Sequence, residues 1–149
     1  MWYRVFAASD APIEPAALLE HLAELGRHVR GDFRGDEEGW FAVNLELDGA
    51  IVAEVQRYLV SEEGIRAELN AWAAWIEQAG EGTSQQGRLM QQVISTRQLF
   101  TIKAAPNADP RIEHLCLATC KFLLSQTGGV YQIDSQGFFD PDGKLLLGD

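Results

Sequence analysis

Two cysteines are the first residues of this sequence whose type and spacing could support chemistry. Cys116 and Cys120 stand four residues apart within a helical pattern, and Glu113 falls on the same helix face. Two thiolates and one carboxylate lack the fourth ligand that zinc usually takes, and His114 is rotated to roughly the other side of the helix. Free cysteines are commonly buried as small apolar residues. We therefore expect both thiols in the core, and neither a metal nor a cofactor.

A run of charged residues around a predicted turn is the second candidate, comprising Asp32, Arg34, Asp36, Glu37 and Glu38. Its carboxylates could hold Mg²⁺, or could combine with a histidine that the fold brings near to form a small hydrolase or transferase site. A solvated hairpin end accounts for the same residues with no bound ion. We keep this acidic turn as a secondary candidate surface.

The tail contains a shorter acidic motif, Asp140-Pro141-Asp142-Gly143. Its two carboxylates match part of a calcium-binding loop, but an earlier carboxylate and the terminal bidentate glutamate are missing. Proline and glycine at these positions are typical of a turn, which is the interpretation that we favour. The sequence also has no nucleophile elbow, no HExxH motif and no phosphate-binding P-loop.

Charge and composition narrow the class of protein. The chain has 149 residues, and 12 Lys and Arg stand against 22 Asp and Glu, for a formal net charge of -10. This field repels phosphate backbones and anionic lipid headgroups, so we expect neither nucleic-acid nor membrane binding. The first residues lack the pattern of a secretory signal, and no apolar run approaches the roughly 20 residues that span a bilayer. With only two cysteines, these features predict a cytoplasmic protein.

The elements that must position these residues follow from the hydrophobic period, which alternates between two and about 3.6. Strands are expected over residues 3–8, on either side of the acidic turn, over 51–58 and 99–103, and in an antiparallel meander over 130–147. Helices are expected over 15–25, stopped by Gly26; over 61–79, capped by Ser61; around 89–94; and over 110–127, capped by Asp109. Trp72 belongs to the apolar stripe of the second helix, so we expect it in the core.

The hairpin around Asp48 and Gly49 allows its register to be predicted. A two-residue loop would set the apolar face of one strand against the polar face of its partner. A three-residue loop, Asp48-Gly49-Ala50, avoids this mismatch and is the one that we expect. It pairs Leu47 with Ile51, Leu45 with Ala53 and Val43 with Val55.

Strands grouped in hairpins with helices between them predict the α+β class. We expect residues 1–149 to form one domain, with a mainly antiparallel twisted sheet of about five to seven strands covered by about four helices.

The face of the hairpin that points away from the core is the leading candidate for function. The predicted register places Trp40 across from Tyr58 and Ala42 across from Gln56, which gives an aromatic patch bordered by polar groups. Helices on this face would instead bury the two aromatic side chains in a second core layer.

The sequence thus favours a non-catalytic protein-interaction module of bacterial type. It would bind a protein partner, or a second copy of itself, through the sheet face that carries Trp40, Ala42, Gln56 and Tyr58. A small hydrolase or transferase built from dispersed carboxylate, Arg and His residues is the alternative, together with a module that binds a small ligand in an apolar pocket.

Overall fold

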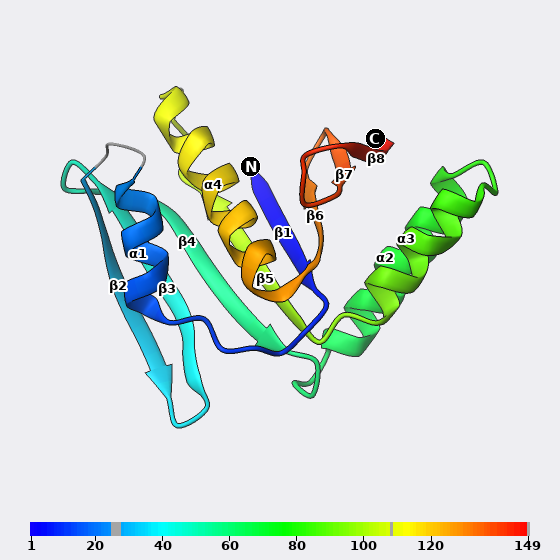
Figure 1. Ribbon diagram of the computed structural model, residues 1–149, viewed down its shortest axis with the longest axis horizontal. Coiled ribbons are helices and arrows are strands. Elements are labelled where there is room, and N and C mark those ends of the chain that lie inside the picture. The colour runs from blue at the N-terminus through cyan, green and yellow to red at the C-terminus, as the bar shows by residue number, and fades with distance from the viewer. Residues whose placement is uncertain (25–27, 108, 149) are drawn as a thin grey trace.

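An antiparallel sheet with helices on both faces forms the framework of the protein (Figure 1). The computed structural model describes residues 1–24, 28–107 and 109–148, and within these residues the sheet has eight strands and four helices pack on it. The predicted α+β class is confirmed, with slightly more strands than the five to seven expected. The predicted helix stop at Gly26 lies outside the described residues.

The sheet order is β2-β3-β4-β5-β1-β6-β7-β8, so the N-terminal strand lies in the interior of the sheet. The strands are β1 (Trp2–Ala7), β2 (Val29–Asp36), β3 (Gly39–Leu47), β4 (Ala50–Leu59), β5 (Gln98–Ala104), β6 (Gly129–Ile133), β7 (Gly137–Phe139) and β8 (Leu145–Gly148). The helices are α1 (Pro15–Ala23), α2 (Ile65–Ala79), α3 (Ser84–Ile94) and α4 (Pro110–Thr127). The tail forms the expected antiparallel meander.

A side-chain cap marks the start of α4 as predicted, whereas the predicted start of α2 is wrong. The Asp109 side chain accepts the backbone N–H of Arg111 at 2.9 Å, and Pro110 opens α4 as expected. The second helix does not start at the predicted cap Ser61. Gly64, in the left-handed region at φ 86°, precedes its first residue, because the chain must first turn out of β4 before it can enter α2.

The β3–β4 hairpin has the predicted strand register but a different loop. Leu45 faces Ala53 and Val43 faces Val55, as expected, whereas Leu47 faces Ala50 across a two-residue turn. Asp48 and Gly49 both have positive φ, 53° and 83°, which is the conformation that suits a tight hairpin. The mismatch of faces is removed by a β-bulge between Leu45 and Glu46 rather than by a third loop residue.

Two apolar layers hold the sheet. Helices α1 and α4 pack on one face around a large core that includes Val5, Val43, Val55 and Phe100. Helices α2 and α3 pack on the other face, over the end of the sheet where Phe6 and its neighbours on β5 and β6 lie. Trp72 is only partly buried there, so its expected core position holds in part. No helix of the described chain has both the length and the hydropathy needed to cross a membrane.

Candidate protein-binding face

The second face of the sheet is covered by helices only in part. Within the described residues, α2 and α3 pack over Phe6, Leu99 and Val130, and the rest of this face carries mainly polar side chains together with Trp2 and Ala42. The strand register aligns Gln56, Thr101, Arg4 and Gln132 in one row across four strands. We call the following set the open face: Trp2, Arg4, Glu54, Gln56, Tyr58, Thr101, Lys103, Gln132 and Asp134.

Arg4 lies at the centre of the open face, where its guanidinium group contacts Gln132, Asp134 and Trp72. Its Nη1 donates to Gln132 Oε1 and to Asp134 Oδ1, both at 2.8 Å, and its guanidinium carbon lies 4.9 Å from the ring centroid of Trp72. Partial burial opposes the charge on Asp134, but hydrogen bonds from Arg4 and Gln132 outweigh it and lower the pKa of Asp134. The charges of Arg4 and Asp134 therefore offset each other within the sheet.

Trp2 is the exposed aromatic residue of the open face. Its side chain is 37% exposed, and two cations hold its ring, with Lys103 Nζ at 5.4 Å and the Arg4 guanidinium carbon at 5.9 Å from the centroid. A hollow of about 410 Å³ lies beside it, bordered by Tyr58, by Thr101 and by the start of α2. The hollow is therefore lined by both aromatic and polar side chains.

A short hydrogen-bonded chain on β4 reaches the hollow through Gln56 and Tyr58. The Tyr58 hydroxyl donates to Gln56 Oε1, and Gln56 Nε2 donates to Glu54 Oε1 at 2.7 Å. Burial raises the pKa of Tyr58, so its phenol is neutral and a hydrogen-bond donor at neutral pH. The three side chains thus form one continuous hydrogen-bonded chain along β4.

Trp40 is not part of this face, which corrects the predicted aromatic patch. A β-bulge between Arg34 and Gly35 in the β2–β3 pairing leaves Phe41 unpaired and turns Trp40 to the α1 side. There its side chain is 7% exposed, its Nε1 donates to the Ile13 carbonyl at 2.8 Å, and its ring packs edge-on against Phe33. Trp40 and Tyr58 consequently lie on opposite faces.

The remaining residues of the predicted patch stay on the second face. Ala42 pairs with Gln56 as expected, but Ala42 is 2% exposed. Gln56 and Tyr58 border the hollow next to Trp2. Ala42, Gln56 and Tyr58 thus lie on one face of the sheet, where Trp2 and not Trp40 is the neighbouring tryptophan at the hollow.

The acidic turn forms the outer end of the β2–β3 hairpin. Asp32, Arg34 and Asp36 belong to the edge strand β2 and are exposed, while Glu37 and Glu38 form the turn itself. The fold does not bring His21 or His114 to them. His21 packs on Phe122 of α4, with ring centroids 4.9 Å apart on the opposite face, and His114 is exposed on α4 itself. His28 is exposed just before β2.

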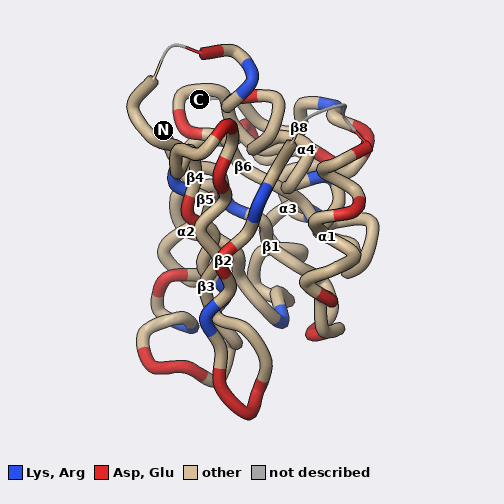
Figure 2. The backbone as a smooth tube through the Cα atoms, turned by 90° about the vertical axis from the view of Figure 1, so that its left-hand side faces the viewer, with Lys and Arg blue, Asp and Glu red and all other residues tan. Residues whose placement is uncertain are grey.

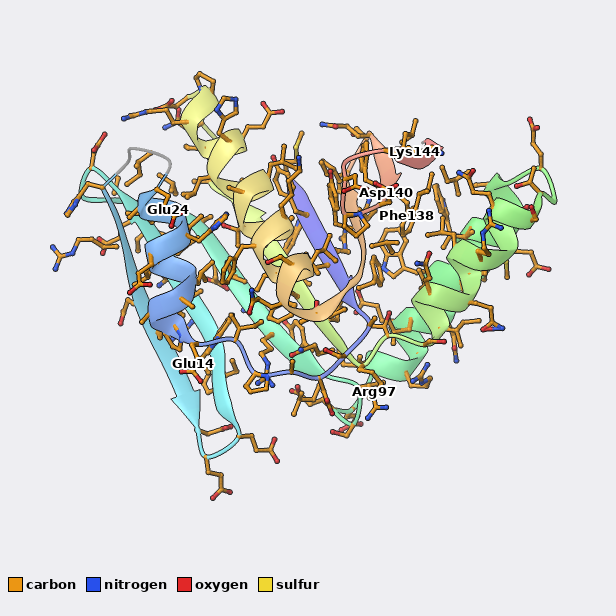
Figure 3. The ribbon with its side chains drawn as sticks, viewed as in Figure 1. Glu14, Glu24, Arg97, Phe138, Asp140 and Lys144 are labelled. Atoms are coloured by element: carbon orange, nitrogen blue, oxygen red, sulfur yellow. The ribbon has the colours of Figure 1, made fainter. Side chains whose placement is uncertain are left out.

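The other candidate ligands are accounted for by packing and turn chemistry. Cys116 and Cys120 are buried free thiols, and burial raises both pKa values, that of Cys116 to about 12. The Asp140 carboxylate accepts the backbone N–H groups of Asp142 and Lys144, both at 2.9 Å, which closes the tail turn seen in Figure 3. The described residues contain no group of three His, Cys, Asp or Glu placed to hold a metal.

Seven residues of the open face were not predicted from the sequence: Trp2, Arg4, Glu54, Thr101, Lys103, Gln132 and Asp134. A signal for them exists in the sequence. Arg4 interrupts the apolar sequence of β1, and Thr101 and Lys103 alternate with buried residues on β5. This alternation indicates that one face of each strand is partly polar. The sequence did not show that these strands are neighbours.

Comparisons of the chain with protein-family models, with curated proteins and with solved structures find no match.

The Arg4–Asp134 ion pair leads us to predict how the stability of the protein depends on pH. Because the pKa of Asp134 is lowered in the folded state, its charged form stabilises the protein above the unfolded value of about 3.9, and this stabilisation is lost as the pH falls through the lower, folded pKa. Asp134→Asn should therefore lower the free energy of unfolding at pH 7 by up to about 1 kcal/mol, since the side chain is 38% exposed.

Thermal unfolding followed by circular dichroism between neutral and acidic pH measures this effect. The gap between Asp134→Asn and wild type should begin to narrow below roughly pH 4, where the carboxyl of the unfolded chain takes up a proton, and should close below the lower, folded pKa of Asp134. Asp142→Asn, in an exposed turn, is the control and should follow wild type throughout. A gap that stays constant down to acidic pH would show that the charge of Asp134 does not contribute.

Proposed function

We propose that this protein is a non-catalytic binding module that recognises a segment of another protein on the open face. The observation that carries the proposal is Trp2, an aromatic side chain left accessible in the interior of a sheet and held there by Lys103 and Arg4 beside a hollow. Rigid aromatic and Arg side chains of this kind dominate the binding energy of protein interfaces. The hydrogen bonds of Arg4 and Tyr58 keep the surface in one arrangement before a partner arrives.

Charge points to a basic partner. Arg4 and Asp134 neutralise each other, and the other charged groups on or beside the hollow are Glu54, Glu63, Glu68 and Lys103. This excess of carboxylates adds to the formal net charge of the chain, -10, which attracts cationic segments over long range. The proposed ligand is therefore a basic peptide segment with one apolar side chain that packs on Trp2.

The proposal also covers the cellular compartment in which the protein acts. Two free buried thiols fit a reducing compartment, and we place the protein and its partner in the cytoplasm.

Selection of peptides from a random display library on the immobilised protein tests this function. Recovered peptides should carry net positive charge, and fluorescence anisotropy should show that Trp2→Ser weakens their binding by about tenfold or more, because an interface anchor is lost. Thr101→Arg should weaken binding similarly, since it fills the hollow and repels a cationic ligand.

Gln126→Arg is the matched control, because it adds the same charge at an exposed site on α4. This variant should bind the peptides like wild type. Recovery of no peptide, or of peptides whose affinity is indifferent to both Trp2→Ser and Thr101→Arg while circular dichroism shows folded variants, contradicts the proposal.

A further inference from the structure

The outer edge of the sheet carries a charge pattern that is complementary to itself. Strand β2 ends the sheet on one side, and Figure 2 looks onto this edge, where blue and red segments follow each other. Arg30, Asp32, Arg34 and Asp36 alternate in sign on one side of the strand, and all four side chains are exposed. In the part of the chain that the structure describes, none of the four forms an ion pair within the protomer.

An eight-residue edge strand with open backbone groups is a template for another strand. If two copies met in antiparallel fashion around a twofold axis at Phe33, Arg30 would face Asp36 of the second copy, and Asp32 would face its Arg34. Symmetry doubles both contacts, so every charged side chain on this side of the strand would meet an opposite charge.

No neighbouring register does as well. A strand can shift only in steps of two residues, because a shift of one turns its side chains to the other face. A shift in one direction sets Asp32 against Asp32 and Arg30 against Arg34, whereas a shift in the other sets Arg34 against Arg34 and Asp32 against Asp36. Like charges directly opposite each other are destabilising, so the pattern selects one register.

The two sides of β2 are compatible with this pairing. The charged side lies on the face of the sheet away from α1, since Arg34 pairs with Ala42 and Asp32 with Asn44 on that face. On the α1 side, the residues that would meet are Gly31 and Gly35, which have no side chains, around the half-buried Phe33. Residue 31 must stay small, because a Cβ atom at Gly31 would lie only 3.0 Å from Cδ2 of Leu19.

We propose that the protein forms a symmetric dimer in which two β2 strands pair in antiparallel fashion about Phe33, joining the two sheets into one. The second copy is the occupant because the edge complements its own charges. The dimer also places two open faces on the same side of a continuous sheet, which would let it bind two basic segments at once.

Charge-reversal variants test the dimer and its register by sedimentation velocity. Wild type should dimerise in the micromolar range, as suits a small interface, and high salt should dissociate it. Arg34→Asp and Asp32→Arg should each weaken self-association by about tenfold, because both symmetric contacts become repulsive.

An equimolar mixture of the two variants should form a heterodimer. In one contact the aspartate introduced by Arg34→Asp would face the arginine introduced by Asp32→Arg, and in the other contact the unchanged Asp32 and Arg34 would meet as in wild type. Both contacts would then join opposite charges, so the mixture should recover the association that each variant alone loses.

Three results overturn the proposal. Wild type could remain a monomer up to millimolar concentration, the two reversals could leave a dimer intact, or the mixture could fail to associate when both variants are folded. Arg88→Asp is the matched control, because it makes the same charge change at an exposed position on α3 and should leave the dimer unchanged. The test is independent of peptide binding, so either proposal can fail without the other.

Discussion

Replacing Trp40 with alanine is expected to lower the free energy of unfolding by about 3–5 kcal/mol. The indole is almost fully buried between α1 and the sheet, where it packs against Phe33 and Phe100 with ring centroids 5.5 and 5.9 Å away. Its Nε1 also donates to the Ile13 carbonyl, which fixes the segment that leads into α1. Truncation therefore removes apolar burial, leaves a cavity and leaves a buried carbonyl without its donor.

Phe41→Ala is the matched control, because Phe41 is the next residue and is 44% exposed. Its removal should cost under about 1 kcal/mol. Urea unfolding followed by circular dichroism compares both variants with wild type. If the order of the two costs were reversed, the bulge that directs Trp40 to the α1 side would not exist in solution, and Trp40 would return to the candidate interface.

Phe138→Ala should destabilise the protein to a similar extent, by about 3–5 kcal/mol. Phe138 is fully buried between the tail meander and α2, as its label in Figure 3 shows, with Phe6, Trp72 and Trp75 around it at centroid distances of 5.7, 5.8 and 6.0 Å. This ring joins the last strands of the sheet to the second helix layer, so its loss opens a cavity at the centre of an aromatic cluster.

Leu145→Ala provides the comparison, since Leu145 belongs to the same meander and is 50% exposed. It should cost under about 1 kcal/mol in the same urea experiment. Phe138→Ala should also shift tryptophan fluorescence to longer wavelength, because Trp72 and Trp75 gain contact with water. A cost below about 1 kcal/mol for Phe138→Ala would mean that the tail does not pack on α2.

Much of the fold was predicted correctly because helix ends and strand faces depend on interactions between residues that are close in sequence. Helix α4 begins after the cap Asp109 and ends at Thr127, as expected. The pairing of Val43 with Val55 followed from keeping apolar faces together. Neither β-bulge was predicted. The position of an extra residue in one strand depends on the partner strand and on where the redirected side chain can be buried, and a single strand does not contain this information.

The candidate site was harder to predict because its residues are distant in sequence. Arg4 and Asp134 are 130 positions apart and meet only because β6 pairs with β1. The hairpin alone predicted that Gln56 lies across from Ala42, but it wrongly set Tyr58 across from Trp40. Their neighbour Thr101 required the pairing of β4 with β5. Strand order depends on long-range packing, which a single strand pattern does not encode.

Backbone amide chemical shifts, measured while a selected basic peptide is titrated into the ¹⁵N-labelled protein, test most directly that the open face is the binding site. The largest changes should fall on β1, β4 and β5 around Arg4, Gln56 and Thr101. The groove along α4 that carries Arg111, His114 and Lys121 should stay unchanged, since α4 covers the other face of the sheet. Changes centred on that groove, with the open face unaffected, would contradict the account.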